Sequence, residues 1–207
     1  KVLVNDNWGE VPDVPALRAA AAAQGAFALP EGSRDAAMLV TLTPGSYTVQ
    51  VAGSGTGAAA QGVAIVEVYE ADASPSTLVN LSCRARVGLD GNIMIAGFTI
   101  AGTGSKRVLL RAVGPMLGNL GVTSPLADPK LDVIVQSTGV TVATNDNWDP
   151  ALTPTFSSVG AFALTPGSRD AALVATLAPG AYTVQVSGVG TGTAAQGVAI
   201  VEVYELP

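Results

Sequence analysis

A gapless internal duplication constrains this chain more than any other feature of its sequence. Residues 25–70 align with residues 160–205, and 36 of the 46 positions are identical. Asn5-Asp6-Asn7-Trp8 also returns as Asn145 to Trp148, five residues out of register with the main match. The offset is far longer than the roughly 20 to 50 residues of a solenoid repeat or a propeller blade. The duplication therefore predicts separately folded domains in tandem.

The segment between the two copies has no second copy of its own, and this predicts the domain boundaries. Residues 71–139 occur once. We expect half a repeat unit at 1–70, the C-terminal half of a β-sandwich, followed by a linker at 71–77. A complete unit should follow at 78–207.

The first four residues suggest how the half unit is completed. Lys1 to Val4 fall opposite Thr141 to Thr144, so the chain is expected to open inside a β-hairpin. A half-sandwich leaves strand edges that can pair with another strand. Upstream chain or a neighbouring subunit could supply the missing strands by strand addition. Both alternatives give a linear assembly.

Short β-branched runs separated by Gly, Pro, Asp and Asn predict an all-β fold. We expect an antiparallel β-sandwich, Ig-like or jelly-roll-like, in tandem units. Asp90-Gly91 favours a tight hairpin turn, and Val14 to Gln24 has helical propensity. The expected strands are 37–42, 46–52, 62–70, 78–87, 92–101, 106–113, 130–136, 139–144, 171–177, 181–187 and 197–204.

The composition narrows the choice of partners. Charged residues make up 13% of the chain, against about 25% in a typical globular domain, so part of the surface is expected to be buried by other copies of the chain. The net charge is −6 and the basic residues are scattered, which argues against binding nucleic acid. No apolar run is long enough to span a bilayer, so we expect no membrane insertion.

The order of motifs along the complete unit resembles a known kind of module. It is similar to β-sandwich modules that recur, often in tandem or at the C-terminus, in large secreted and surface proteins of bacteria, and more weakly to pre-peptidase C-terminal domains. The resemblance covers nearly the whole chain. It implies an extracellular or cell-surface accessory or structural module, and it brings no catalytic residues. The motifs that carry it are Leu81 to Val87, Gly97 to Ile100, Lys106 to Pro115, Leu126 to Pro129, Asn145 to Trp148, Pro179 to Val184 and Val198 to Glu205.

Residues able to perform catalysis are scarce, and we predict that the protein is not an enzyme. The chain has no histidine, which excludes Ser-His-Asp and Cys-His mechanisms and any histidine zinc site. Cys83, the one cysteine, is expected to be a buried, inert thiol. The pairs Glu67/Glu70 and Glu202/Glu205 should point to opposite strand faces and act as solvated strand-end charges.

The repeated Asn-Asp-Asn motif is a candidate calcium site, because its oxygen ligands are those that Ca²⁺ prefers. The candidate ligands are Asn5, Asp6, Asn7, Asn145, Asp146, Asn147 and Asp149. The alternative is that these side chains cap turns by bonding their own backbone. Arg34-Asp35 and Arg169-Asp170 either fix their loops through charge-assisted bonds or form exposed pairs of little energetic value.

Two functions compete. The first is a structural protein, a subunit or segment of an extracellular filament or cell-surface array that assembles through its sandwich units. The second is a carbohydrate-binding or adhesive accessory module of a large secreted protein, with a cell-surface glycan as ligand. Exposed aromatic rings would favour the second, but aromatic residues are only 5% of the chain. Trp8, Trp148, Tyr47 and Tyr182 are expected to be core residues.

Overall fold

The computed structural model describes residues 3–73 and 76–207, apart from the side chain of Ala59. The chain divides into two compact units, Lys1–Leu78 (unit 1) and Val79–Pro207 (unit 2). Lys1 and Val2, half of the strand expected at 1–4, lie outside the described residues, as do 74 and 75 of the expected linker. In the described ranges no helix is long and apolar enough to cross a bilayer.

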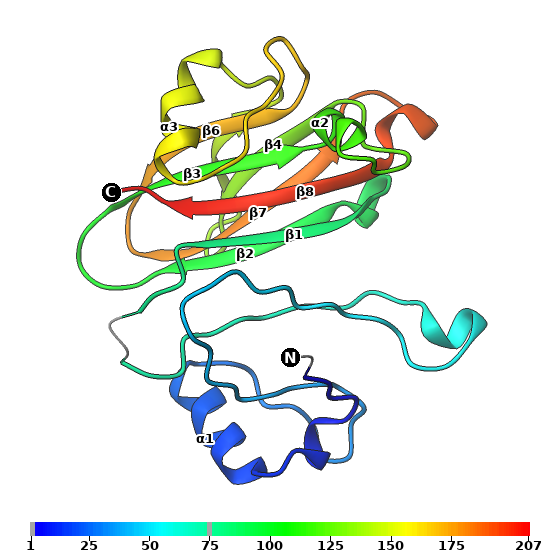
Figure 1. Cartoon of the computed structure of the whole chain (residues 1–207), viewed down its shortest axis with the longest axis vertical. Helices are drawn as coiled ribbons and strands as arrows, with labels where there is room; N and C mark the ends of the chain where they lie inside the picture. Colours follow the sequence, from blue (N-terminus) through cyan, green and yellow to red (C-terminus); the bar gives the residue numbers. More distant parts are fainter. Residues whose placement is uncertain (1–2, 74–75) are drawn as a thin grey trace. The chain divides into compact units, whose positions relative to one another are not determined.

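Unit 2 is an antiparallel β-sandwich of two four-stranded sheets, which confirms the predicted fold class (Figure 1). The first sheet has the order β1-β8-β3-β6 and the second the order β2-β7-β4-β5. The strands are β1 (Asn80–Val87), β2 (Met94–Ile100), β3 (Lys106–Val113), β4 (Pro129–Val135), β5 (Val140–Asn145), β6 (Ala171–Leu177), β7 (Gly180–Gly188) and β8 (Gly197–Glu205). All eight agree with the expected strands to within two residues.

The core between the sheets follows the alternation of apolar residues along each strand. Val108, Leu110 and Ala112 of β3 point into this core with Val184 and Val186 of β7, and all five are buried. Residues i and i+2 of a strand share a face, so one face of each sheet closes the sandwich.

β3 is buried on both of its faces. Leu109 and Val113 belong to a second apolar cluster with Trp148, Phe156 and Tyr204. Helices α2 (Pro115–Asn119) and α3 (Thr153–Ser158) supply Leu117 and Phe156 to this cluster. The first sheet therefore has the sandwich core on one face and a helical cap on the other.

The paired strands lie farther apart in sequence than predicted. Asp90-Gly91 was expected to form a hairpin turn, but it lies in a 3-10 turn, Asp90–Asn92, between strands of different sheets. β1 pairs with β8 and β2 pairs with β7. The hairpin prediction is wrong because both strands find partners from the C-terminal part of the chain.

Unit 1 contains one α-helix, α1 (Val14–Ala23), as predicted. Asp13 caps it by accepting a hydrogen bond from the amide of Ala16, at 2.9 Å. Three strands were expected at 37–42, 46–52 and 62–70, but no β-strand is assigned within residues 3–73. These segments are the second copies of β6, β7 and β8.

The strand pairing in unit 2 explains why that prediction is wrong. β6 pairs with β3, β7 pairs with β2 and β4, and β8 pairs with β1 and β3. β6, β7 and β8 therefore never pair with one another. A segment that carries only these three sequences lacks the strands that would form its ladders.

Candidate functional site

The Asn-Asp-Asn-Trp motif of unit 2 fastens the end of β5 to the start of β6. The side-chain oxygen of Asn145 accepts a hydrogen bond from the amide of Ala172, at 2.9 Å. Trp148 is buried, and its indole Nε1 donates to Ser168 Oγ at 3.2 Å. Its backbone amide donates to the carbonyl of Asp170, at 2.9 Å. The motif thus joins β5 to β6 across the residues between these two strands.

The remaining candidate calcium ligands also bond to nearby groups. Asp146 Oδ1 accepts a hydrogen bond from Asn147 Nδ2 at 3.2 Å. Asp149 Oδ1 accepts from the amide of Ala151 at 2.9 Å and caps a 3-10 turn. These contacts match the turn-capping alternative. Calcium binding stays a prediction, which thermal unfolding with and without added Ca²⁺ would test.

In unit 1 the same motif lies beside a shallow hollow. Asn5 repeats the contacts of its counterpart, bonding the carbonyl of Asn7 and the amide of Ala37. Asn7 Nδ2 donates to Glu10 Oε1 at 3.1 Å, and Asp6 is exposed. The hollow, of about 480 Å³, is lined by Asn7, Trp8, Gly9, Glu10, Glu31, Gly32, Ser33 and Arg34. Within the described parts of the chain, no three Asp, Glu, His or Cys side chains cluster as a metal site would need.

Asp170 is a buried hydrogen-bond acceptor in unit 2. Its side chain is fully buried, and Oδ1 accepts hydrogen bonds from the amides of Gly114, at 2.8 Å, and Met116, at 3.3 Å. Oδ2 accepts from Ser168 Oγ at 2.6 Å. Of the two alternatives for Arg169-Asp170, the structure shows the one in which the loop is fixed. The hydrogen bonds that fix it are those of Asp170. Arg169 is exposed and pairs with Asp128, at 2.9 Å.

Two further buried charges of unit 2 are Arg111 on β3 and Glu202 on β8. Arg111 Nε lies 2.8 Å from Glu202 Oε2, and both side chains are almost fully buried. The guanidinium lies over the rings of Phe156 and Phe162, at 4.7 and 4.3 Å, and Nη1 donates to the Phe162 carbonyl at 2.6 Å. A solvated Glu202 was expected, and that prediction is wrong because Arg111 holds the carboxylate under the helical cap.

The angle of this ion pair does not meet hydrogen-bond geometry. Arg111 Nε and Nη2 and Glu202 Oε2 are buried without a hydrogen-bond partner among the described residues. Removing one member of a buried pair leaves the other as an uncompensated charge. Loss of either member of the pair is therefore expected to destabilise unit 2.

Tyr204 completes this polar group. Its hydroxyl donates to Glu202 Oε1 at 2.9 Å. Burial, and then the negative charge of Glu202, raise the pKa of Tyr204 to about 12. The phenol therefore stays protonated and keeps donating to the carboxylate.

The sequence analysis missed the arginine-glutamate pair. A signal was present, since Arg111 interrupts the apolar run Val108 to Val113 near its middle. A charge in a strand that is buried on both faces needs a partner. Its partner lies on a distant strand, so sequence spacing alone could not identify it.

Unit 1 repeats those bonds of this site whose two partners both occur in the repeated sequence. Trp8 Nε1 donates to Ser33 Oγ at 3.1 Å, and Ser33 Oγ donates to Asp35 Oδ2 at 2.6 Å. The Tyr69 hydroxyl donates to Glu67 Oε1 at 3.0 Å. Each bond has a counterpart in unit 2, at Trp148, Ser168 and Tyr204.

The long-range bonds of this site are not repeated in unit 1. Asp35 and Glu67 are both exposed, and within residues 3–73 neither has a counterpart of Gly114 or Arg111 as a partner. Their polar atoms are thus arranged as in unit 2, but no strand within residues 3–73 meets them.

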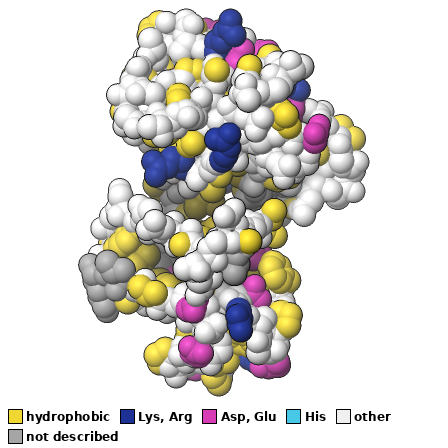
Figure 2. All heavy atoms as spheres, turned by 90° about the vertical axis from the view of Figure 1, so that its right-hand side faces the viewer, with side chains coloured by type: hydrophobic (Ala, Val, Ile, Leu, Met, Phe, Trp, Pro, Cys, Tyr) yellow, Lys and Arg dark blue, Asp and Glu magenta, His cyan; other side chains and the backbone are white. Residues whose placement is uncertain are grey.

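The apolar side chains of residues 37–70 are exposed as well. Tyr47 is 54% exposed, whereas its counterpart Tyr182 is 6% exposed, so the predicted core position of Tyr47 is wrong. Val63 is 99% exposed and Ile65 is 75% exposed. Figure 2 shows hydrophobic side chains at the surface of this unit. The further exposed apolar residues are Met38, Leu39, Val40, Leu42, Val49, Val51, Val66, Val68 and Tyr69.

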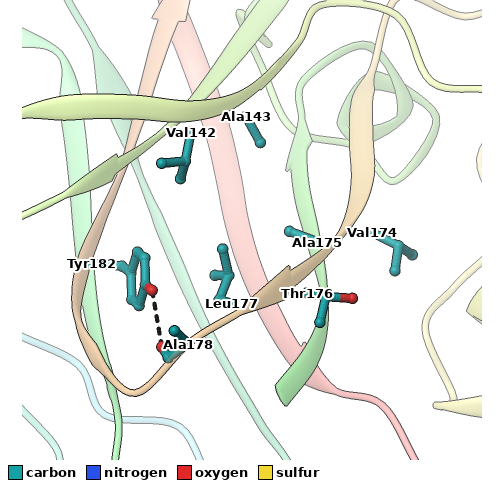
Figure 3. Close-up of a pocket in the computed structure, with 8 residues that line it drawn as sticks. All are labelled: Val142, Ala143, Val174, Ala175, Thr176, Leu177, Ala178 and Tyr182. Carbon is teal, nitrogen blue, oxygen red and sulfur yellow. Dashed lines mark hydrogen bonds between the residues drawn. The ribbon is translucent and has the colours of Figure 1, made fainter. Parts of the chain in front are cut away.

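A crevice of about 400 Å³ opens between β5 and β6 of unit 2 (Figure 3). Its lining side chains are apolar apart from Thr176 and the Tyr182 hydroxyl, and that hydroxyl donates to the Ala178 carbonyl at 2.9 Å. It is lined by Val142, Ala143, Val174, Ala175, Thr176, Leu177, Ala178 and Tyr182. These side chains offer a ligand apolar contact and no charged group.

Cys83, Glu205 and Glu70 are further residues considered from sequence, and Glu70 is exposed and accepts a hydrogen bond from the amide of Leu78. Cys83 was expected to be buried but is exposed on the edge strand β1, whose first five residues are all exposed. Glu205 lies on the opposite face of β8 from Glu202 and pairs with Lys106. An exposed pair of this kind contributes little to stability.

Comparison with known proteins gives one structural likeness. No protein-family model and no curated protein matches the sequence. A solved structure, the pre-peptidase C-terminal domain of a collagenase from Bacillus anthracis, is similar to 60% of this chain and 89% of its own, with a TM-score of 0.37 and 11% identity. A likeness at this level says nothing about the function of this chain.

Proposed function

We propose that this protein is a non-catalytic structural protein, one segment of an extracellular filament or cell-surface array built from β-sandwich units. The observation that carries the proposal is the contrast between its two copies of the β6–β8 sequence. In unit 2 this sequence closes a sandwich. In unit 1 the same sequence forms no strand and leaves its apolar side chains exposed.

An exposed set of apolar, strand-forming segments favours assembly. Monomeric soluble proteins rarely expose contiguous apolar patches larger than a few hundred Å², and extended segments with free backbone groups bind other strands. One chain carries both these exposed segments and a complete sandwich. When the segments bind a neighbouring molecule, the chain therefore connects one unit to the next. The low content of charged residues, 13%, fits a surface that is partly buried by neighbours.

The competing function is a ligand-binding accessory module. The exposed rings of Phe27 and Tyr47, 58% and 54% exposed, favour it because sugars stack on flat aromatic surfaces. Both rings belong to unit 1, where no strand within residues 3–73 covers them. Assembly therefore accounts for these rings as well as for the aliphatic residues around them.

Electron microscopy and light scattering of the purified chain would separate the two functions. The structural proposal expects regular elongated particles whose length increases with protein concentration. A monodisperse monomer that binds immobilised glycans would refute it and support the accessory module. Tyr47→Ala should abolish glycan binding if the rings form a sugar platform, and Tyr182→Ala, at the buried counterpart, is the control for effects on folding.

A further inference from the structure

Unit 2 shows what covers the β6–β8 sequence when its partners are present. We call residues 79–145, which contain β1 to β5, the scaffold, and residues 160–205, which contain β6 to β8, the closed tail. Residues 25–70 of unit 1 are the open tail. The two tails are identical at 36 of 46 positions, so they present nearly the same side chains to a partner.

We propose that the open tail binds an additional scaffold, a polypeptide segment with the sequence pattern of residues 79–145 that is not already paired with a tail of its own. The inference deepens the proposed function and rests on it, because it identifies the partner by which one unit joins the next. The bound scaffold takes the strand register that unit 2 shows.

The register follows from the pairings of the closed tail. Tyr204 lies opposite Asn80, Ala172 opposite Arg111 and Tyr182 opposite Phe98. The counterparts of these tail residues lie 135 positions earlier in the sequence. In the additional scaffold the residues equivalent to Asn80, Arg111 and Phe98 therefore meet Tyr69, Ala37 and Tyr47. A slip by one residue would turn every apolar side chain to the wrong face.

Charge complementarity selects the same partner. Glu67 is exposed and accepts a hydrogen bond from Tyr69, in the arrangement that Glu202 and Tyr204 adopt beside Arg111. The scaffold supplies that arginine in the centre of β3. Asp35, bonded to Ser33 as Asp170 is to Ser168, likewise lacks the two amide donors that Gly114 and Met116 provide in unit 2.

Shape complementarity adds an independent observation at a glycine. A Cβ atom on Gly197 would lie 2.5 Å from the amide nitrogen of Leu126, because the scaffold backbone passes directly over it. At the equivalent Gly62 a Cβ atom would meet nothing within 4 Å. Gly62 thus leaves space for a backbone that unit 1 does not contain.

The scaffold of unit 2 is already paired with the closed tail, since β1 pairs with β8, β2 with β7, and β3 with β6 and β8. Residues 1–207 hold two tails and one scaffold. A scaffold that binds the open tail while unit 2 stays closed is therefore an additional one.

The test joins a second copy of residues 79–140 directly ahead of residue 1 of the full chain. Residues 1–4 align with 141–144, so this fusion restores an uninterrupted scaffold before the open tail. Hydrogen exchange followed by mass spectrometry should show that the amides of residues 37–70 exchange at least about 100-fold more slowly than in the unfused chain, because they become part of a folded sheet.

Gly62→Ala makes the test specific for the proposed register. In the fusion it should return residues 37–70 to fast exchange, because the new Cβ atom meets the scaffold backbone. In the unfused chain it should change nothing. Gly197→Ala is the matched control and should weaken protection of residues 171–205 in both proteins.

Fast exchange of residues 37–70 in the fusion would overturn the inference, and so would slow exchange that Gly62→Ala does not affect. The proposed array is tested separately from this pairing. If the fusion is protected but microscopy shows no elongated particles of the native chain, the array is refuted and the pairing remains. If particles form while residues 37–70 stay unprotected, the array remains and this pairing is refuted.

Discussion

Residues 25–70 and 160–205 carry nearly the same sequence, but only the second set forms strands. The short-range bonds are nonetheless the same in both. The Tyr47 hydroxyl donates to the Thr43 carbonyl as that of Tyr182 does to Ala178, and Gln61 and Gln196 bond the carbonyls four residues before them. Turns and caps therefore form from the local sequence, whereas the strands of this fold form only against a partner that is distant in sequence.

This comparison suggests that one scaffold could serve either tail. In unit 2 the end of β8 lies opposite the start of β1, with Tyr204 paired to Asn80. Tyr69 is the counterpart of Tyr204, and only residues 70–79 separate it from Asn80. A loop of this length can close a hairpin at small entropic cost. The open tail is therefore expected to pair with this scaffold when the closed tail is absent.

The largest effect is expected from removing the closed tail. A chain that ends at Asn145 should fold as a permuted sandwich, with the open tail paired to β1–β4 through a hairpin at 70–79. We expect a cooperative transition with a free energy of unfolding of about 5 kcal/mol, the lower range for small domains. Circular dichroism and hydrogen exchange of residues 37–70 would measure it.

Gly62→Ala in the truncated chain is the control for this prediction. It should abolish the transition, because the scaffold backbone would now pass over residue 62. A truncated chain that stays unfolded, or one whose folding is unaffected by Gly62→Ala, would show that the two tails are not interchangeable.

The next largest effect should come from the buried ion pair. Glu202→Gln leaves the Arg111 charge without its partner, so unit 2 should lose about 3 kcal/mol of unfolding free energy. Glu67→Gln, the same change in the open tail, should alter stability by less than about 0.5 kcal/mol, as an exposed substitution does. Urea denaturation of both variants would measure the difference. Equal effects would contradict the view that Glu67 lacks an arginine.

A smaller loss of unfolding free energy is expected from substituting Asp170. Asp170→Ala removes the acceptor for the amides of Gly114 and Met116, and leaving such buried donors unsatisfied should cost about 2 kcal/mol. Asp35→Ala removes only the local bond to Ser33 and should cost well below about 1 kcal/mol. Thermal unfolding of each variant, fitted separately for the two units, would compare them. A large loss at Asp35 would indicate a long-range partner in unit 1.

The contrast between the tails also explains what could be predicted from sequence. Alternating apolar residues located all eight strands of unit 2, and the helical run at Val14 predicted α1. The same pattern wrongly predicted a strand at 37–42. Alternation indicates which face of a strand is buried, and not whether a neighbouring strand exists. The hairpin predicted at Asp90-Gly91 is wrong for a related reason, since a turn sequence does not determine which strands pair across it.

The site divides in the same way. The bonds of Asn145 and Trp148 reach partners 27 and 20 residues away, and the repeated motif drew attention to both residues. The contact between Arg111 and Glu202 joins strands that lie far apart in sequence. No spacing rule connects these two residues, so only the folded sheet shows that Glu202 is buried.

The smallest predicted effect is a dependence of stability on alkaline pH. The pKa of Tyr204 rises from its ordinary 10.0 to about 12 in the folded unit, through burial and the charge of Glu202. A raised pKa means that the stabilisation is complete below pH 10 and is lost as the pH rises towards 12. Unit 2 should therefore lose about 1 kcal/mol between pH 9 and pH 11.

Tyr204→Phe should remove this pH dependence, because phenylalanine has no proton to lose. Burial and Glu67 also raise the pKa of Tyr69, but its tail forms no sheet, so Tyr69→Phe should leave the unfolding of unit 2 unchanged at every pH. Urea denaturation at pH 9, 10 and 11 would compare the two variants with the parent chain. If Tyr204→Phe kept the full loss, a different group would be titrating. If Tyr69→Phe removed it, the open tail would already be bonded to the scaffold.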